Sequence, residues 1–321
     1  MKLHVLLLAA ALAGCAAVTA PSGPGPTMPA LTDGSFTARD GMVLPLRHWG
    51  PLDHPRAVIV ALHGMSDYSN AFALPGATWA AQGILTLAYD QRGFGAAPGS
   101  GLWAGAGVMR DDLRDAVAAA HARWPGVPVF ALGESMGGAV LLTALEQPLD
   151  VKGAILVAPA VWSRGDMPLS YRVALFLAAH LMPGLVLSNS AASHVVTIIP
   201  SDNIEMLRAM GRDPLVQKKT RADMVFGLTN LMDEARTAPA RIAAAAPPIL
   251  LLYGARDQLI PAAPTKAVIA MLGARATVRH YENGYHMLLR DLDRALPQGD
   301  IAAWILRSDG PAGRAPPGRQ R

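Results

Sequence analysis

The sequence predicts an α/β fold with a doubly wound, mostly parallel sheet and a helical lid inserted after its sixth strand. Short apolar runs alternate with stretches of helical spacing, which is typical of this architecture. The runs are apolar throughout, as strands covered by helices on both faces must be. The alternation breaks once, between residues 162 and 236. We therefore expect strands at residues 57–62, 84–89, 127–132, 154–157, 249–253 and 277–281, and helices at 111–124 and 296–306.

The chain begins like a secretory signal peptide. Lys2 precedes an apolar run at residues 3–12, which is too short to span a bilayer. Residues 12–15, Leu-Ala-Gly-Cys, resemble the lipobox of bacterial lipoproteins, in which the cysteine is lipidated and becomes the N-terminus. Cys15 is the only cysteine, so no intrachain disulfide can form. We expect residues 1–17 to be a lipoprotein-type signal peptide and Cys15 to carry a lipid that anchors the protein to a membrane.

The same N-terminus predicts a location in the bacterial cell envelope, facing the periplasm. By resemblance to sorted lipoproteins, Ala16 in place of an aspartate favours the outer membrane over the inner one. The alternative is ordinary cleavage near Ala17 or Ala20, which would discard Cys15 and release a secreted protein.

Two segments without strand or helix signals flank the folded region. Residues 18–31 are rich in proline, glycine, serine and threonine and are expected to be a flexible tether. Residues 308–321 have a similar composition and are expected to be a disordered tail. Between them we expect a core of residues 32–161 and 237–307. Residues 162–236 follow a strand end, where ligands bind in this architecture, so we expect a lid there; ordinary packed helices are the alternative.

Composition argues against several classes of function. Of 321 residues, 51% are hydrophobic, which suffices for one large α/β domain or two smaller ones. Much of the net charge of +4 comes from the C-terminal tail, and no basic stripe carries interleaved aromatic residues, so we expect no nucleic-acid partner. The sequence contains no zinc-protease, EF-hand or P-loop motif and no dinucleotide-binding glycine pattern, so we expect neither a metal nor a cofactor.

The most informative motif links the predicted strand at 127–132 to a helical stretch. Residues 133–138 read Gly-Glu-Ser-Met-Gly-Gly, a G-x-S-x-G pattern in a strand–turn–helix context. Glycines two residues before and two after the serine allow a turn sharp enough to lift its hydroxyl above the sheet edge. The new helix directs its first amides to the place where an oxyanion would form. We predict that Ser135 is a nucleophile.

A nucleophilic serine requires a base, and the base requires an acid to orient it. In this architecture the order along the chain is serine, acid, histidine. Of the four histidines after Ser135, His286 lies in a turn just past the last predicted strand, where it can reach the sheet edge. Asp257 lies in the loop after the preceding strand and is the predicted acid. Asp166 and Asp202 are rivals by chain order, but they lie in the predicted lid.

An oxyanion needs two backbone donors. The amide of Met136, directly after the nucleophile, is one candidate. The amide of Met65 is the other, because it follows the predicted strand at 57–62 and Gly64 lets the backbone turn there. His63 precedes the serine and is expected to fix this loop by a hydrogen bond.

Six segments carry a resemblance to a known family. They are Leu-His-Gly at 62–64, Tyr-Asp-Gln-Arg-Gly-Phe-Gly at 89–95, the motif at 133–138, Asp-Pro-Leu at 213–215, Tyr-Gly-Ala-Arg-Asp at 253–257 and Tyr-Glu-Asn-Gly-Tyr-His at 281–286. Over about residues 36–306 the chain resembles the α/β-hydrolase superfamily, and within it the monoacylglycerol lipase and lysophospholipase-like group. The resemblance implies a triad of Ser135, Asp257 and His286 and oxyanion donors at Met65 and Met136. Arg92 is expected to brace the site. A lipobox and tether depart from the family's usual pattern.

These features predict a membrane-tethered serine carboxylester hydrolase that works through an acyl-enzyme. The apolar lid stretch suggests an acyl chain, which makes monoacylglycerol or lysophospholipid the first choice of substrate. Hydrolysis of small esters, thioesters or a proline-type peptide on the same triad is the alternative among enzymes. A non-catalytic lipoprotein that uses the fold as a binding module is the alternative from another class, and the complete triad argues against it. The sequence carries no signal for an oligomeric state.

Overall fold

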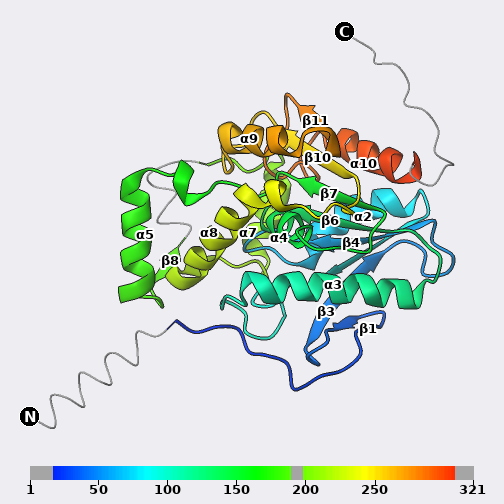
Figure 1. Ribbon diagram of the computed structural model, residues 1–321, viewed down its shortest axis with the longest axis horizontal. Coiled ribbons are helices and arrows are strands. Elements are labelled where there is room, and N and C mark those ends of the chain that lie inside the picture. The colour runs from blue at the N-terminus through cyan, green and yellow to red at the C-terminus, as the bar shows by residue number, and fades with distance from the viewer. Residues whose placement is uncertain (1–16, 189–197, 308–321) are drawn as a thin grey trace, which may run out of the picture.

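The computed structural model describes residues 17–188 and 198–307. Its strands are β1 (Ala30–Leu31), β2 (Ser35–Thr37), β3 (Val43–Trp49), β4 (Ala57–Leu62), β5 (Ile84–Tyr89), β6 (Val129–Glu134), β7 (Gly153–Val157), β8 (Val186–Ser188), β9 (Lys219–Arg221), β10 (Ile249–Gly254) and β11 (Ala276–Tyr281). Nine of these form the central sheet, in the spatial order β1-β2-β3-β5-β4-β6-β7-β10-β11 (Figure 1). The pairings of β1, β2 and β3 are antiparallel, and all pairings from β5 to β11 are parallel. The six predicted strands and the mostly parallel α/β fold are confirmed.

Helices cover both faces of this sheet. The α-helices are α2 (Ala73–Ala80), α3 (Ala106–Arg123), α4 (Met136–Ala144), α5 (Leu169–Leu181), α7 (Ile204–Arg212), α8 (Ala222–Thr237), α9 (Ala262–Leu272) and α10 (Ala295–Arg307). In β4, alternate side chains enter two separate cores: Val58 lies in a core shared with residues of α3, α4 and α8, whereas Ile59 lies in one shared with residues of α2 and α10. Every residue of β4 is buried. This two-sided burial explains why the strand is apolar throughout.

The expectation of a flexible tether at residues 18–31 is wrong. Thr19 forms a bridge with Trp103, and the amides of Gly23 and Gly25 donate to Asp40 Oδ2 and Asp40 O at 2.9 and 2.8 Å. The segment then enters the sheet as β1. A composition rich in proline and glycine disfavours long strands, but it leaves amides that can bond to a neighbouring loop. Residues 1–16, including Cys15, and residues 308–321 lie outside the described part of the chain.

The insertion expected after the sixth strand follows β7, the seventh in chain order. Short strands near the N-terminus account for the difference in count. The insertion is mainly helical, as predicted, but β8 and β9 pair as a small antiparallel sheet that the sequence did not indicate. Helix α8 packs against α4 and buries Met224 and Leu231 in the main core. Part of the predicted lid therefore belongs to the main core. No helix in residues 17–188 and 198–307 is both long and apolar enough to cross a membrane.

Arg92, which was expected to brace the site, instead joins the N-terminal region to α3. Its guanidinium donates to Asp112 at 2.8 and 2.7 Å and to Asp40 at 2.6 and 2.8 Å. Burial raises the pKa of Asp112 to about 6, although the charge of Arg92 acts in the opposite direction. Asp112 therefore depends on Arg92 to remain ionised inside the protein.

We expect Arg92→Met to lower the free energy of unfolding by about 3–5 kcal/mol, because it leaves a buried carboxylate without its partner. Arg241→Met is the matched control, since Arg241 pairs with Glu146 at the surface. Its cost should be about 1 kcal/mol or less. Urea denaturation measures both values. Equal losses in the two variants would contradict the special role of Arg92.

Candidate active site

Ser135 occupies a strained turn between β6 and α4. Its backbone has φ 53° and ψ −114°, a conformation rarely adopted by residues other than glycine. A Cβ on Gly133 would lie 2.2 Å from the carbonyl oxygen of Gly137, and a Cβ on Gly137 would lie 2.2 Å from that of Leu62. Only glycine fits at both positions. The turn is therefore held by the close approach of β6, α4 and β4.

The loop after β4 lies directly beside the serine. A Cβ on Gly64 would be 3.2 Å from the Cβ of Ser135 and 3.8 Å from its Oγ. His63 holds this loop from behind: its Nε2 accepts from the amide of Gln91 at 3.0 Å, and its Nδ1 lies 2.9 Å from Gly64 O. Burial lowers the pKa of His63, so the ring stays neutral and can accept. Met65 and Ser135 both line the cavity above the loop.

The loops after β10 and β11 bring Asp257 and His286 together. His286 Nδ1 and Asp257 Oδ2 are 2.8 Å apart, and their side chains are 5% and 0% exposed. Asp257 Oδ1 accepts from the amides of Leu259 and Ile260 at 2.8 and 2.9 Å, so the carboxylate cannot rotate freely. Ser135 and His286 both lie in the described part of the chain, and no hydrogen bond joins Ser135 Oγ to His286 in this structure. Catalytic contacts of this kind often form only when substrate is bound.

The two rival acids have other partners. Asp166 accepts from Ser163 Oγ at 2.7 Å and lies 3.4 Å from Arg236. Asp202 accepts from the amide of Leu292 at 2.8 Å. Neither carboxylate is paired with His286. Among the candidates, the arrangement at His286 favours Asp257.

One buried arginine, which the sequence did not indicate, joins the segments that carry Met65, Ser135 and His286. Arg290, four residues after His286, donates from Nη1 to Asp67 Oδ2 at 2.7 Å and from Nη2 to Glu134 Oε2 at 3.1 Å. Asp67 belongs to the loop that contains Met65, and Glu134 directly precedes Ser135. We call Asp67, Glu134 and Arg290 the buried charge cluster. Its one sequence signal is the charged pair that follows the apolar run at 287–289.

The charges of this cluster depend on one another. Burial raises the pKa of Glu134, while the charge of Arg290 acts against that rise. Burial alone would lower the pKa of Arg290, but the two carboxylates outweigh it and raise it. The carboxylate of Glu134 is also close enough to His286 for their charges to interact. The cluster therefore contributes to the electrostatic environment of His286 as well as fixing the loops.

The segment before α7 is fastened to the loop that carries His286. The amide of Met287 donates to Pro200 O at 3.0 Å, and Ser201 Oγ donates to Asp291 Oδ1 at 2.6 Å. Asp291 Oδ2 accepts from the amide of Tyr285 at 2.8 Å. Burial raises the pKa of Asp291 to about 6 despite these bonds. Part of the insertion thus supports the site directly.

A cavity of about 670 Å³ opens above Ser135. Its walls come from the loop after β4, from α5 and α8 of the insertion, and from the loops after β10 and β11. Most of the side chains that line it are apolar, and they include Met65, Trp162, Tyr171, Leu175, Val225, Leu228, Met232, Ile260 and Met287. Phe176 and Leu177 do not line the cavity and are exposed outside it. An extended apolar group is the ligand that such a cavity suits.

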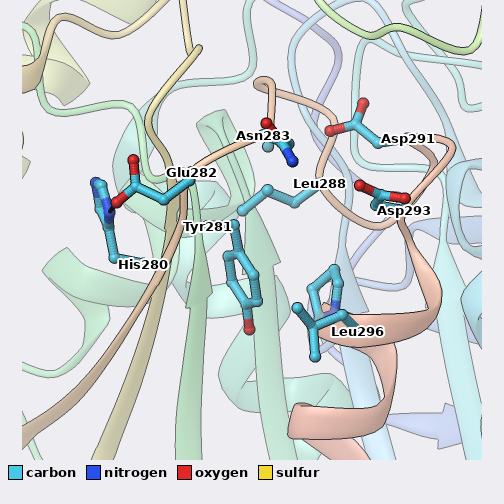
Figure 2. Close-up of a pocket in the computed structure, with 10 residues that line it drawn as sticks. His280, Tyr281, Glu282, Asn283, Leu288, Asp291, Asp293 and Leu296 are labelled. Atoms are coloured by element: carbon cyan, nitrogen blue, oxygen red, sulfur yellow. Dashed lines mark hydrogen bonds and ion pairs between the residues drawn. The ribbon is translucent and has the colours of Figure 1, made fainter. Parts of the chain in front are cut away.

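A second cavity of about 320 Å³ lies at the edge strand β11 (Figure 2). Tyr281, Leu288 and Asp291 are among its lining residues, together with the start of α10. Asp291 is already bonded to Ser201 and Tyr285, and Tyr281 donates to Asp300 at 2.9 Å. Neither Ser135 nor His286 lines this cavity. No group of three or more metal-ligating side chains is present in the described ranges 17–188 and 198–307.

Comparison with known proteins identifies relatives of the chain. It is 28% identical over 292 residues to the monoglyceride lipase of Homo sapiens, which covers 87% of this chain and 91% of that protein. It is also 28% identical over 282 residues to the monoacylglycerol lipase of Mycolicibacterium smegmatis. That alignment covers 85% of this chain and 96% of that protein. These relatives match over nearly their whole lengths.

Solved structures share the fold. The monoacylglycerol lipase of Paleococcus ferrophilus aligns with a TM-score of 0.67 at 21% identity, covering 83% of this chain and 99% of that one. A second structure is a soluble variant of the monoglyceride lipase of Saccharomyces cerevisiae in complex with a substrate analog. It aligns with a TM-score of 0.71 at 18% identity and covers 91% of this chain and 99% of that one. The family described as serine aminopeptidase, S33, matches residues 53–293. The chain is a serine ester hydrolase with an α/β-hydrolase fold, and it belongs to the S33 family.

Proposed function

We propose that the protein hydrolyses monoacylglycerol or lysophospholipid through an acyl-enzyme formed on Ser135. The observation that carries this proposal is the position of Ser135 in a strained turn at the floor of a large apolar cavity. The pair of His286 and Asp257 lies at the ends of neighbouring strands of the same sheet. A panel of esters that differ only in acyl length tests the proposal most directly.

The proposed reaction begins with attack of Ser135 Oγ on the ester carbonyl carbon. His286 takes the serine proton on Nε2, while Asp257, bonded to Nδ1, orients the ring and stabilises its positive charge. The tetrahedral intermediate collapses when His286 donates that proton to the departing ester oxygen, and glycerol or a glycerophosphodiester leaves. Water, activated by the same histidine, then attacks the acyl-enzyme and releases the fatty acid.

The oxyanion is proposed to be stabilised by the amides of Met65 and Met136. Met136 is the first residue of α4, so its amide lies at the positive end of the helix. Gly64 lies beside Ser135, which supports the amide of the next residue, Met65, as the other donor. Each donor of this kind typically lowers the barrier by about 2.7–4 kcal/mol.

The composition of the cavity wall favours an acyl chain over a small acid. Each methylene buried against an apolar wall contributes about 0.8 kcal/mol. Relatives named monoglyceride lipase or monoacylglycerol lipase support glycerol as the alcohol. Small-ester or thioester hydrolysis on the same residues remains the alternative. A non-catalytic binding role is set aside because the chain belongs to a family of serine hydrolases.

We further propose that the enzyme is a lipoprotein of the bacterial cell envelope, anchored through Cys15 and facing the periplasm. The lipobox-like residues 12–15 support this proposal. Lipidation would keep the enzyme at the surface where monoacyl lipids reside. Mass spectrometry of the purified N-terminus tests it, and an unmodified N-terminus near Val18 would refute it.

Ser135→Ala should abolish ester hydrolysis and labelling by a fluorophosphonate probe, because no nucleophile remains. Loss of such a residue typically lowers kcat by several orders of magnitude. Asp257→Asn should also cut the rate severely while leaving the fold intact, whereas Asp166→Asn should not. Circular dichroism and thermal melting confirm folding. Near-normal turnover in folded Ser135→Ala would remove the proposed mechanism.

Acyl-chain preference should depend on the wall formed by α8. We expect kcat/KM to rise from acetate to medium-chain esters and Val225→Phe to shorten the preferred chain, because the larger ring fills the cavity. Val108→Phe on α3 is the matched control, since Val108 is exposed and does not line the cavity. Steady-state kinetics on the ester panel measures both variants. A wild-type preference for acetate would point to a small-ester esterase instead.

Arg290→Lys tests the buried charge cluster as a positioning device. Lysine keeps the charge but not the two-pronged geometry that reaches both Asp67 and Glu134. We expect kcat to fall by about tenfold or more with a smaller change in KM, because misalignment affects the reacting groups and shifts only the part of the cavity wall at Met65 and Asp67. Arg241→Lys in the surface pair with Glu146 should leave kcat unchanged. An unaltered kcat in folded Arg290→Lys would restrict the cluster to a structural role.

A further inference from the structure

We propose that residues 213–218, which link α7 to β9, position the loop that carries the proposed oxyanion donor Met65. We call residues 213–218 the clamp and residues 63–68, which follow β4, the oxyanion loop. This inference rests on the proposed acyl-enzyme mechanism and adds two positioning residues to it, Tyr68 and Asp213. The first three residues of the clamp are the Asp-Pro-Leu segment at 213–215, to which the mechanism gives no role.

The oxyanion loop contains a strained residue. Ser66 has φ 67°, in the left-handed region that residues other than glycine seldom adopt. It directly follows Met65, and both residues line the cavity above Ser135. A strained backbone persists only where the surrounding structure holds it. The contacts that hold Ser66 therefore influence where the amide of Met65 lies.

The clamp bonds to the oxyanion loop at two points. The amide of Gln217 donates to Ser66 O at 2.8 Å. Tyr68 OH donates to Asp213 Oδ2 at 2.6 Å, although these residues are 145 positions apart in the chain. Burial and the bond to Asp213 raise the pKa of Tyr68 to about 12, so its hydroxyl stays protonated and can donate. The clamp thus holds the loop on both sides of Asp67.

Bonds within the clamp make it a rigid support. Asp213 Oδ1 accepts from the amide of Leu215 at 2.9 Å. Lys218 Nζ donates to Asp213 O and Val216 O at 2.8 and 2.9 Å. It also donates to Met210 O, in the last turn of α7, at 2.6 Å. The two ends of the clamp are therefore joined to each other and to a helix.

A further bond joins the clamp to the neighbour that holds the start of the oxyanion loop. Gln217 Nε2 donates to Gly93 O, in the loop after β5, at 2.6 Å. The amide of Gln91, in that same loop, donates to His63 Nε2 at 3.0 Å. The oxyanion loop is thus fixed at its start through His63 and at its end through Tyr68. The support at Tyr68 can be removed by deleting a single oxygen atom.

A matched pair of tyrosines separates positioning from stability. Tyr68→Phe removes the bond to Asp213 and keeps the ring. Tyr281→Phe removes a similar bond, because Tyr281 OH donates to Asp300 Oδ2 at 2.9 Å. Tyr281 lines the second cavity, away from Ser135 (Figure 2). The two tyrosines are 5% and 8% exposed, so we expect similar losses of thermal stability in the two variants.

The first experiment measures kcat and KM on a soluble nitrophenyl ester. We expect Tyr68→Phe to lower kcat about tenfold with a smaller change in KM, because a displaced amide weakens the transition state more than the bound ester. Tyr281→Phe should change kcat by less than about twofold. An unaltered kcat in folded Tyr68→Phe, or an equal fall in both variants, would overturn the role of the clamp.

The second experiment reports on the oxyanion itself. An alkyl trifluoromethyl ketone adds to a nucleophilic serine and forms a tetrahedral oxyanion, whereas the methyl ketone with the same chain binds without forming one. We expect Tyr68→Phe to weaken inhibition by the trifluoromethyl ketone about tenfold and inhibition by the methyl ketone less than twofold. Equal weakening of both would mean that Tyr68 only shapes the cavity, and would overturn the positioning role.

A double-mutant cycle tests whether Tyr68 and Asp213 act through one bond. The double variant Tyr68→Phe/Asp213→Ala should be no slower than Asp213→Ala, because no bond between the two is left to remove. Losses that multiply would overturn the pairing. Where Asp213→Ala does not fold, the tyrosine pair and the two ketones decide the matter by themselves.

Failure of the clamp and failure of the proposed substrate give different results. Wild type is assayed on monoacylglycerol beside the nitrophenyl ester. Hydrolysis of the nitrophenyl ester alone would count against monoacylglycerol as the substrate. The tyrosine variants would still decide the role of the clamp, because every ester forms the same oxyanion.

Discussion

The site depends on the close approach of β6, α4 and β4 around Ser135. Gly133 and Gly137 have no room for a side chain, and Ser135 itself takes a conformation that most residues avoid. Such strain persists only where the surrounding structure is rigid. The two parallel neighbours of β6, which are β4 and β7, provide that rigidity. Strand β4 pairs with β6 along its length, and Ser135 N donates to Val157 O, at the end of β7, at 3.0 Å. The sheet therefore fixes the position of Ser135 without help from the loops.

The buried charge cluster holds the loops around the site in place, as the sheet holds Ser135. Arg290 bonds to Asp67, in the loop of Met65, and also to Glu134, which precedes Ser135. Arg290 itself lies four residues after His286. Burying three charges carries a large desolvation cost, and apolar residues of similar volume would often be as stable. Apolar contacts would allow the loops to slide, however, whereas a guanidinium bonded to two carboxylates specifies one arrangement. We infer that the cluster aligns the loops around the site, and that this alignment offsets its desolvation cost.

The sequence predicts those parts of the molecule whose signals are local. Buried parallel strands are apolar on both faces, and the Gly-x-Ser-x-Gly motif, His286 and Asp257 each follow such a strand. By contrast, β3 carries Arg47 and His48 and pairs antiparallel at the side of the sheet, so it lacks a continuous apolar run. The role of Arg290 could not be predicted, because it depends on contacts with Asp67 and Glu134, which are distant in the chain. The docking of residues 19–31 likewise depends on Asp40 and Trp103, and composition alone predicted flexibility there.

Helix α5 shows how one apolar segment can serve two environments. Its inner side, at Tyr171 and Leu175, faces the cavity above Ser135, and its outer side, at Leu177 and Leu181, is exposed. Packing against a protein core requires one apolar stripe, so a helix that is apolar on both sides and little buried needs a further explanation. Of its 13 residues only Ala179 is buried. The proposed acyl ligand accounts for the inner apolar side, since Tyr171 and Leu175 line the cavity above Ser135.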